Sequence, residues 1–352
     1  MDFARDDTQE AVAQVAVDLL ARDLRPDELW RALADADLLS LALPARLGGD
    51  DLGVAEVTAL LTEIGRRAAP VPALATLGFG VLPVRILAAD TQQDELLAGV
   101  ADGAVLTAAL AEVGRAFPAS PAATAVPDGE RHAVTGRFVG VPYAATSRKI
   151  LVPTDAGVIA VEPTAPGVTL TESPSSAHTP ECSVRLESAP GLLLGDGADP
   201  AADVAVLYRL ALAALGAYAD GLLSGATQLT AQHVSTRHQF GKPLAAFQAV
   251  AQQIADVYVT SRTLHVAALA AAWRVAQDAR SAAADDDLDV AAYWIATELP
   301  PAVRVLHHLH GGLGVDETYP LHRYSSTAKD LARLLGGASY RLDLVGARCS
   351  SI

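Results

Sequence analysis

Apolar residues recur at three- and four-residue steps through the N-terminal part of the chain. The clearest run is Val54, Val57, Leu60, Leu61 and Ile64. This spacing places all five side chains on one face of a helix. Proline and paired glycines separate such runs from one another, as helix breakers do. The pattern predicts an α-helical domain over residues 1–100. Glu63, beside the apolar face, is expected to be a solvated or capping charge.

The pattern changes between residues 101 and 200. Short alternating runs replace the helical period, and glycine and proline separate them. Examples are Ala133-Val134-Thr135-Gly136, Lys149-Ile150-Leu151-Val152 and Cys182-Ser183-Val184-Arg185-Leu186. Alternation of this length is typical of half-buried strands. We therefore expect a small, mainly antiparallel β domain over residues 101–200.

Helical periodicity returns from residue 201 and predicts a C-terminal four-helix bundle over residues 201–352. The most apolar stretch, residues 204–223, is interrupted by Arg209, Gly216 and Asp220. It is too broken to span a membrane and is expected to be a buried packing helix. Pro300-Pro301 either kinks the third helix of this domain or starts a new one. The last helix is expected from about Tyr324 to Leu335 or beyond.

Composition agrees with tightly packed helices and excludes some functions. Hydrophobic residues make up 51% of the chain and aromatic residues only 5%, so small aliphatic side chains must form the core. A formal net charge of −15 argues against nucleic-acid binding, which needs clustered lysine and arginine. The charged N-terminus lacks an apolar signal core. We expect a cytoplasmic protein that binds neither nucleic acid nor membrane.

Two segments of the C-terminal half carry candidate chemistry. The first is Arg237-His238-Gln239-Phe240-Gly241-Lys242-Pro243, with Gln248 shortly after it. An arginine offers a fork of donors to a phosphate or an adenine edge, and a phenylalanine packs on a flat ring. Gln248 adds a further hydrogen-bonding side chain. Each residue alone would also fit an ordinary corner between two helices.

The second segment is His310-Gly311-Gly312-Leu313-Gly314, with Tyr319-Pro320 behind it. Glycines allow positive φ and let a backbone approach a ligand closely, so a diphosphate could lie against this turn. A glycine helix cap is the alternative reading. His307, His308 and His310 lack a Cys, Asp or Glu to complete a metal site, so no metal is expected.

Taken together, the two segments resemble the acyl-CoA dehydrogenase family, and the resemblance spans nearly the whole chain. It implies an α+β fold with an N-terminal α-helical domain, a middle antiparallel β domain and a C-terminal four-helix bundle. In that family FAD lies at a subunit interface, and the neighbouring subunit holds its ADP half. The resemblance assigns that role here to Arg237, Gln239, Phe240, Gln248, His308, Gly311 and Gly312.

The chain departs from the family where a subunit contacts its own flavin and substrate. The family's Thr-Glu-Pro segment is replaced by Thr107–Val113, and its Trp-Ile-Thr by Val139-Gly140-Val141. The catalytic glutamate aligns with Leu335, and its alternative position lies near Ala211. The Thr-Ser-Gln contact is replaced by Gly337–Arg341. Leucine cannot remove the α proton of a thioester, so no catalytic residue is assigned to this chain.

These departures resemble a non-catalytic β-type subunit of an α2β2 acyl-CoA dehydrogenase. Such enzymes are known from actinobacteria, where they act on steroid side-chain CoA thioesters. The implied partner is a catalytic α-type subunit that supplies the glutamate, shares the FAD and binds most of the acyl-CoA. Two alternatives stay open. One is a self-sufficient dehydrogenase whose base is Glu112, Glu298, Asp330 or Asp343, and the other is a scaffold subunit without FAD contact.

Overall fold

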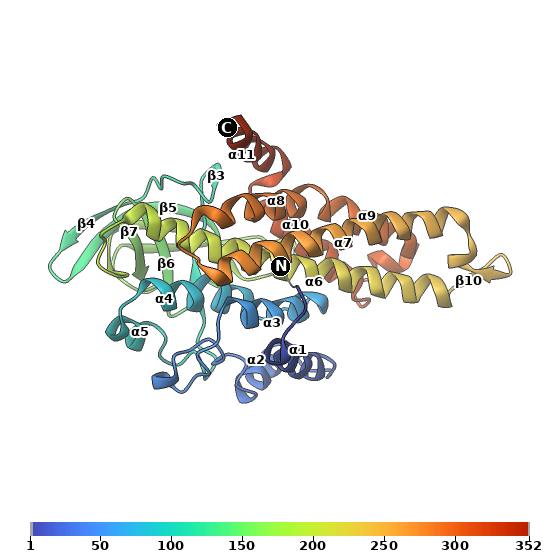
Figure 1. The fold of residues 1–352 in the computed structure, drawn as a ribbon, viewed down its shortest axis with the longest axis horizontal. Coiled ribbons are helices and arrows are strands. Elements are labelled where there is room, and N and C mark those ends of the chain that lie inside the picture. The colour runs from blue at the N-terminus through green and yellow to red at the C-terminus, as the bar shows by residue number, and fades with distance from the viewer. Residues whose placement is uncertain (1–2, 351–352) are drawn as a thin grey trace.

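A computed structural model describes residues 3–350, apart from the side chain of Cys349. Helices form its N-terminal part, a twisted sheet closes one end, and long helices form the rest (Figure 1). The N-terminal elements are α1 (Asp7–Leu20), α2 (Pro26–Asp35), η1 (Ala45–Leu47), α3 (Val54–Arg66), η2 (Leu74–Val81), α4 (Leu82–Leu87) and α5 (Asp90–Leu96).

The middle of the chain forms one nine-stranded sheet of order β1-β6-β7-β9-β5-β2-β3, with β4 on β5 and β8 on β9. Every pairing except β1 with β6 is antiparallel. The strands are β1 (Leu106–Ala108), β2 (Ala111–Glu112), β3 (Arg115–Ala116), β4 (Thr124–Asp128), β5 (Arg131–Pro142), β6 (Lys149–Thr154), β7 (Gly157–Val161), β8 (Val168–Ser173) and β9 (Glu181–Leu193).

The C-terminal part is helical except for a short hairpin. Its elements are α6 (Pro200–Thr236), β10 (His238–Gln239), β11 (Lys242–Pro243), η3 (Leu244–Ala246), α7 (Gln248–Gln277), η4 (Ala282–Ala284), α8 (Asp285–Thr297), α9 (Leu299–His310), η5 (Gly311–Val315), α10 (Leu321–Leu334) and α11 (Gly337–Ser350). The two prolines start a new helix, since Pro300 and Pro301 lie in the first turn of α9. A further helix, α11, follows the expected last one.

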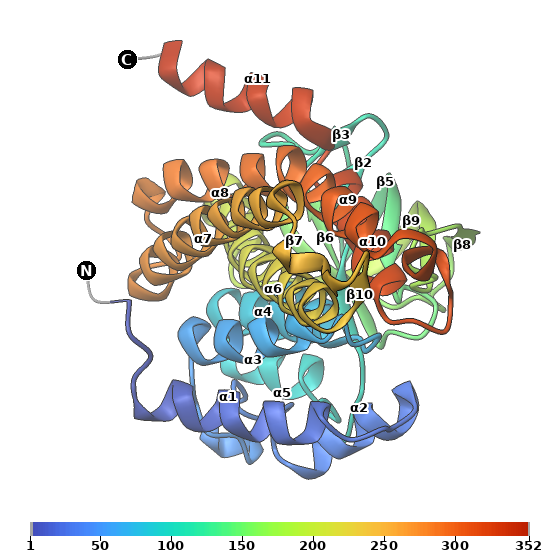
Figure 2. The same cartoon turned by 90° about the vertical axis from the view of Figure 1, so that its right-hand side faces the viewer.

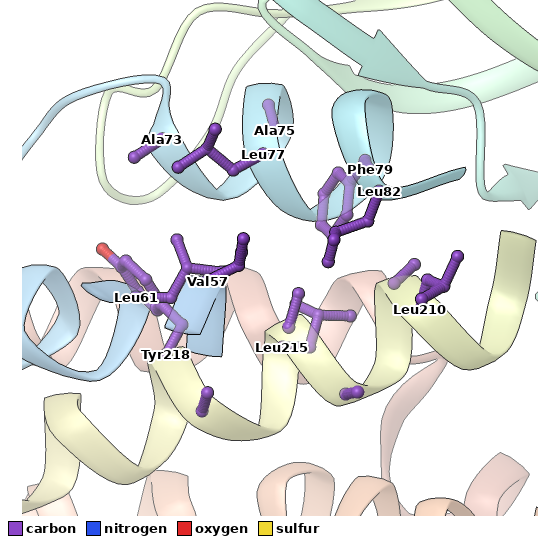
Figure 3. Close-up of a cluster of buried hydrophobic side chains, with 14 of the residues drawn as sticks. Val57, Leu61, Ala73, Ala75, Leu77, Phe79, Leu82, Leu210, Leu215 and Tyr218 are labelled. Carbon is purple, nitrogen blue, oxygen red and sulfur yellow. The ribbon is translucent and has the colours of Figure 1, made fainter. Parts of the chain in front are cut away.

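Helix α6 is the centre of the molecule. It is 37 residues long, and it lies between the N-terminal helices and the other C-terminal helices (Figure 2). Its most apolar window is long enough to cross a membrane, but 78% of that window is buried inside the protein. The prediction of a buried packing helix is therefore confirmed. Figure 3 shows Leu210, Leu215 and Tyr218 of α6 facing Val57, Leu61, Leu77 and Phe79.

The backbones of α3 and α6 touch because glycines on each helix face the backbone of the other helix. An ideal Cβ on Gly221 would lie 1.9 Å from the carbonyl oxygen of Thr62, and one on Gly225 would lie 1.9 Å from that of Arg66. Both distances are far inside van der Waals contact. Only glycine fits at these two positions, so the small residues seen in the sequence set the distance between the two helices.

Glu63 corrects one expectation, because it is not a solvated charge. Glu63 is only 4% exposed. Its carboxylate accepts hydrogen bonds from Arg5 Nη2 and Arg66 Nε, each at 2.8 Å. Arg66 also donates to Ser224 Oγ on α6. The arginines hold the pKa of Glu63 below its usual value although burial opposes them. A buried carboxylate with two partners fastens the N-terminal segment and α6 to α3.

Gly221→Ala is expected to lower the free energy of unfolding by about 1–3 kcal/mol or more, since its Cβ must force α3 and α6 apart. Gly216→Ala is the matched control on the same helix. Its Cβ would meet nothing closer than Ala268 Cβ at 3.5 Å, so it should be neutral or stabilise by up to about 1 kcal/mol through helix propensity. Urea unfolding followed by circular dichroism measures both. Equal effects of the two substitutions would contradict the proposed helix contact.

Candidate cofactor site at the end of the helical bundle

A β-hairpin caps the far end of α6 (Figure 1). It takes the place of the simple helix corner that the sequence also allowed. Arg237 ends α6, and strands β10 and β11 pair His238 with Pro243 and Gln239 with Lys242. The two turn residues, Phe240 and Gly241, have φ angles of 52° and 81°. Two positive φ values in a two-residue loop are the geometry of a tight hairpin turn.

The hairpin presents its side chains to solvent. Phe240 is 91% exposed at the tip, and Arg237, Gln239 and Gln248 are exposed as well. Among residues 3–350, the Arg237 guanidinium has no hydrogen bond or ion pair of its own, so all its donors remain available. Lys242 is different, because its ammonium lies 4.2 Å from the centre of the Phe247 ring. That contact steadies the base of the hairpin.

The second segment is an open backbone turn at the end of α9. Gly311 has φ 58° and ψ −134°, a conformation that an L side chain rarely adopts. An ideal Cβ on Gly311 or Gly312 would meet no atom within 4 Å, so the space beside both residues is free for a ligand. The exposed His308 lies one helical turn earlier. Gly311 is the C-cap residue of α9, as the glycine-cap reading expected, and the open space beside it leaves room for a ligand to approach the backbone.

A pair of stacked imidazoles brings the two segments together. His233, one turn before Arg237, lies with its ring centre 4.4 Å from that of His310, and the ring planes differ by 17°. Because His310 directly precedes Gly311, the hairpin and the glycine turn occupy the same end of the bundle, which faces the viewer in Figure 2. Five of the seven residues assigned by resemblance lie on these two segments, and the other two, Gln248 at the start of α7 and His308 near the end of α9, lie next to them in the chain.

The position of the family's catalytic base lies in the core. Leu335 caps α10 and has no exposed surface. Its carbonyl accepts a bond of 2.8 Å from Arg341 Nε. Arg341 is itself 1% exposed, and burial lowers its pKa. Its guanidinium lies 5.1 Å from the Phe117 ring, so the chain's own side chains fill the space around Leu335.

Helix α10 also closes over the segment where the family has Trp-Ile-Thr. Gly140 has φ 62°, and a Cβ there would lie 2.7 Å from Arg333 Nη1. Arg333 Nη2 donates to both carboxylate oxygens of Glu181 at 2.8 Å. Asp330 accepts from the backbone N–H groups of Ser176 and Ala177 at 2.9 and 2.7 Å. Three polar links therefore join α10 to the sheet.

A cavity of about 240 Å³ remains beside these links. Residues of η2 and the preceding loop, the sheet, α6 and α10 form its walls, among them Phe79, Tyr143, Tyr218 and His322. The volume of this cavity lies just below the usual range of roughly 300–1,000 Å³ for a ligand pocket. Leu335 is not among its lining residues.

The alternative bases divide into two groups. Glu112 is 7% exposed and accepts from Ala122 N–H at 2.6 Å and from Arg115 at 3.0 Å. Asp330 is held by the two backbone bonds described above. Glu298 lies half-buried at the break between α8 and α9, and Asp343 lies exposed on α11. The structure gives Glu112 and Asp330 structural tasks. Within residues 3–350, no group of three or more His, Cys, Asp or Glu could hold a metal ion.

The comparisons with known proteins agree with this architecture. Residues 1–104 match the family model for the acyl-CoA dehydrogenase N-terminal domain, and residues 205–349 match that for its C-terminal domain. The chain is 50% identical over 352 residues to the acyl-CoA dehydrogenase FadE28 of Mycobacterium tuberculosis, covering 99% of each chain. This chain belongs to the acyl-CoA dehydrogenase family. The predicted α+β fold of that family is confirmed.

Two solved structures of acyl-CoA dehydrogenases are also similar. The ChsE4-ChsE5 complex of Mycobacterium tuberculosis matches with a TM-score of 0.88 and 30% identity over 100% of both chains. A variant of the steroid ACAD Tcur3481-Tcur3483 matches with a TM-score of 0.86 and 34% identity, covering 98% of this chain and 97% of that one. Proteins of this fold bind FAD, as a glutaryl-CoA dehydrogenase solved with FADH2 illustrates.

Sequence reasoning did not find several residues that shape these regions. His233 carries no local signal, because its role depends on a helix 77 positions away in the chain. The bonds of Arg333 with Glu181 and the packing of Arg341 on Phe117 likewise join distant segments. Only the unusual Leu-Leu-Gly-Gly ending of α10 hinted that this region differs from the family.

Asp330→Asn is expected to destabilise the protein by about 0.5–1.5 kcal/mol, because an amide has one acceptor oxygen for the two backbone N–H groups of Ser176 and Ala177. Asp343→Asn is the control, since its carboxylate is exposed on α11 and should change stability by less than about 0.5 kcal/mol. Chemical denaturation at pH 7 measures both. If Asp330→Asn is as stable as the control, Asp330 does not link α10 to the sheet.

Proposed function

We propose that this chain is the non-catalytic, β-type subunit of a heteromeric FAD-dependent acyl-CoA dehydrogenase. It contributes Arg237, Gln239, Phe240, Gln248, His308, Gly311 and Gly312 to the ADP half of an FAD seated mainly in a catalytic α-type partner. The partner supplies the glutamate base and binds most of the acyl-CoA, in an α2β2 assembly. The bound FAD supplies the hydride acceptor for Cα–Cβ dehydrogenation of the thioester.

The observation that carries this proposal is the contrast between the two ends of the site. The residues that would contact a neighbour's cofactor are exposed and have no other task, as the unpaired Arg237 and the open Gly311 turn illustrate. The residues that would contact the chain's own flavin are occupied, because Arg333 covers Gly140 and Leu335 is buried. A free outward surface, together with an inward region narrowed by the chain's own side chains, suits a chain that completes its partner's pocket.

The groups at the bundle end suit an adenosine diphosphate. Arg237 can pair with phosphate oxygens, the Gly311–Gly312 backbone can approach a diphosphate, and Phe240 can pack on an adenine face. The charge distribution supports this fit. No Asp or Glu occurs between Asp220 and Asp256, although the chain contains 41 of them. An anion therefore meets no local carboxylate along the hairpin segment.

The surroundings of Gly140 and Leu335 do not suit a second flavin in this chain. The Arg333 guanidinium lies where even one methyl group on Gly140 would not fit, and Leu335 offers neither a base nor an exposed surface. We therefore expect one FAD for each pair of α-type and β-type chains, with no independent active site here.

We further propose that the substrate is a steroid side-chain CoA thioester and that the enzyme works in the cytoplasm. Support for the substrate comes from the sequence resemblance and from the similar Tcur3481-Tcur3483 structure, which is a steroid ACAD. A partner subunit is supported by the ChsE4-ChsE5 structure, which is a complex of two proteins. The buried position of the one long apolar helix agrees with a non-membrane location.

Co-expression with the catalytic partner tests the subunit role. The complex should be yellow and hold about one FAD per α–β pair, and Arg237→Ala should raise the Kd for FAD roughly 10- to 100-fold, since a hydrogen bond to a charged group contributes about 1.5–3 kcal/mol. Arg31→Ala is the matched control, an exposed arginine on α2. The FAD content of each complex after desalting, measured as the absorbance of the released flavin, compares the two variants.

Two outcomes would oppose this function. Unchanged FAD affinity in Arg237→Ala would favour a scaffold subunit without cofactor contact. A yellow, active assembly of this chain alone would favour a self-sufficient dehydrogenase.

Removing the remaining candidate bases tests the self-sufficient alternative directly. Glu298→Gln and Asp343→Asn in the complex should each leave kcat within about twofold of the wild type, whereas loss of a true general base typically costs roughly 10²–10⁴-fold. Steady-state assays with an artificial electron acceptor would detect either result. A hundredfold loss in one variant, with FAD content intact, would place the base on this chain.

A further inference from the structure

The hairpin and the glycine turn reach the same place through a small cluster of three side chains. His233 of α6 stacks on His310 of α9 at 4.4 Å between ring centres. Tyr319, in the loop before α10, lies with its ring centre 5.3 Å from that of His310. Each half of the proposed cofactor site begins within four residues of this cluster, at Arg237 and at Gly311.

The hydrogen bonds of His310 define its neutral form. Its Nδ1 lies 2.9 Å from the carbonyl oxygen of Leu306, and because a carbonyl only accepts, Nδ1 carries the proton. In the neutral ring Nε2 is then an acceptor, and the Tyr319 hydroxyl, 3.1 Å away, donates to it. His310 is 5% exposed, so both ring nitrogens are satisfied without water. A second proton on Nε2 would reverse this hydrogen bond, so that the imidazolium donates to the Tyr319 hydroxyl oxygen, and it would place a buried positive charge at the stack.

The charges around the two rings also favour the neutral state. Burial is the main cause that lowers the pKa of His233, and the Arg237 guanidinium lowers it further. Burial is also the main cause that lowers the pKa of His310, and the neighbouring His233 and His307 lower it further. The hydrogen bond to the Leu306 carbonyl oxygen raises the pKa of His310 and so opposes these effects. Tyr319 contributes a neutral hydroxyl. The groups that shift the pKa of the pair lie on α6 and α9 and include no carboxylate. Asp316 and Glu317 of the Tyr319 loop are exposed to solvent.

We propose that the His233–His310 stack and Tyr319 position the two halves of the ADP site, by fixing the end of α9 against the end of α6. His233, His310 and Tyr319 are thus positioning residues that do not themselves touch the cofactor. This inference rests on the proposed function, because it assumes that Arg237 and the Gly311 turn hold FAD. It adds that the affinity for FAD depends on the protonation of this histidine pair.

The direction of the pH effect follows from the neutral form. Since the folded pair resists protonation, its contribution is complete above a pH of about 6.5, the ordinary value for histidine. It is lost as the pH falls through the lowered values of the folded pair. FAD should therefore bind fully at pH 7.5 and more weakly at pH 5.5. Protonation of either ring adds positive charge beside Arg237, which favours separation of the helix ends.

The experiment measures the Kd for FAD of the co-expressed complex at pH 7.5 and 5.5, by titrating FAD into the complex after its cofactor has been removed. The affinity of the wild type for FAD should fall at least about fivefold at the lower pH. Fivefold is the lower end of the typical coupling between two sites. His233→Phe keeps a stacking ring without a titratable nitrogen, so its affinity at pH 7.5 should be near that of the wild type and its loss at pH 5.5 less than half as large. His233→Phe is chosen because His233 is only half-buried.

His265→Gln is the matched control. His265 also joins α6 to a neighbouring helix, through a contact of 2.9 Å between its Nδ1 and the Asp220 carboxylate, but it lies on α7 away from both segments. This variant should show the same pH dependence as the wild type. Tyr319→Phe removes only the hydroxyl and should raise the Kd for FAD about threefold at pH 7.5, while kcat at saturating FAD stays within about twofold.

A structural readout separates positioning from cofactor contact. Hydrogen exchange of the peptides spanning residues 237–243 and 311–320 should speed up together at pH 5.5 in the wild type, after correction for the intrinsic pH dependence, and not in His233→Phe. An equal loss of FAD affinity at low pH in the wild type and in His233→Phe would overturn the inference. So would a wild-type affinity that does not change with pH.

The Arg237→Ala complex distinguishes a failure of the positioning role from a failure of the proposed subunit function. If Arg237→Ala weakens FAD binding while His233→Phe leaves the pH dependence unchanged, the positioning role fails and the subunit function stands. If Arg237→Ala has no effect on FAD binding, the proposed function fails and the positioning role fails with it.

Discussion

The contact between the backbones of α3 and α6 is the constraint on which the rest of the structure depends. It exists because Gly221 and Gly225 leave no side chain between the two helices. Glu63 secures the same contact from the α3 side, through Arg66 and its bond to Ser224. A helix held this firmly acts as a rigid rod. At 1.5 Å per residue, the 37 residues of α6 extend about 55 Å.

That rod connects two regions with opposite properties. Tyr208, on its first half, packs against Phe117 at 5.3 Å between ring centres, in the part where the chain fills its own site. Arg237, about 40 Å further along the same helix, ends in open solvent. Because one helix carries both, the filled region stabilises the element from which the exposed hairpin projects. A leucine buried in the core at position 335 and an exposed arginine at the end of α6 are thus compatible within one stable fold.

Sequence pattern predicted the parts of this architecture that depend on local periodicity. The three- and four-residue spacing of Val54–Ile64 identified α3, and the short run Ala133–Gly136 identified part of β5. It failed where a residue's environment comes from a distant segment. Glu63 resembled a surface charge because Arg5 and Arg66 could not be placed beside it. The two-residue strands β10 and β11 are too short for any periodic signal.

In the candidate site, too, the sequence predicted local features but not the contacts between distant segments. The residue types at Arg237, Phe240 and Gly311 suggested nucleotide chemistry, but only the fold shows that they share one end of the bundle. The contact that unites them, His233 on His310, joins helices α6 and α9, so neither local motif contains both partners. Family resemblance supplied the assignment that local chemistry left open.

The exposed hairpin is a physical argument for a second component. A two-stranded hairpin has little stability of its own in water, and a phenylalanine that is 91% exposed adds apolar surface to its tip. The base of the hairpin is held by the bond from Leu244 N–H to the Arg237 carbonyl and by Lys242 on Phe247, and the centre of the Phe240 ring lies 6.2 Å from that of Phe247. Such a tip gains stability when a flat ring or a protein surface covers Phe240. A cofactor shared across a subunit interface would cover Phe240 in both ways, because the adenine ring and the surface of the partner would contact the hairpin together.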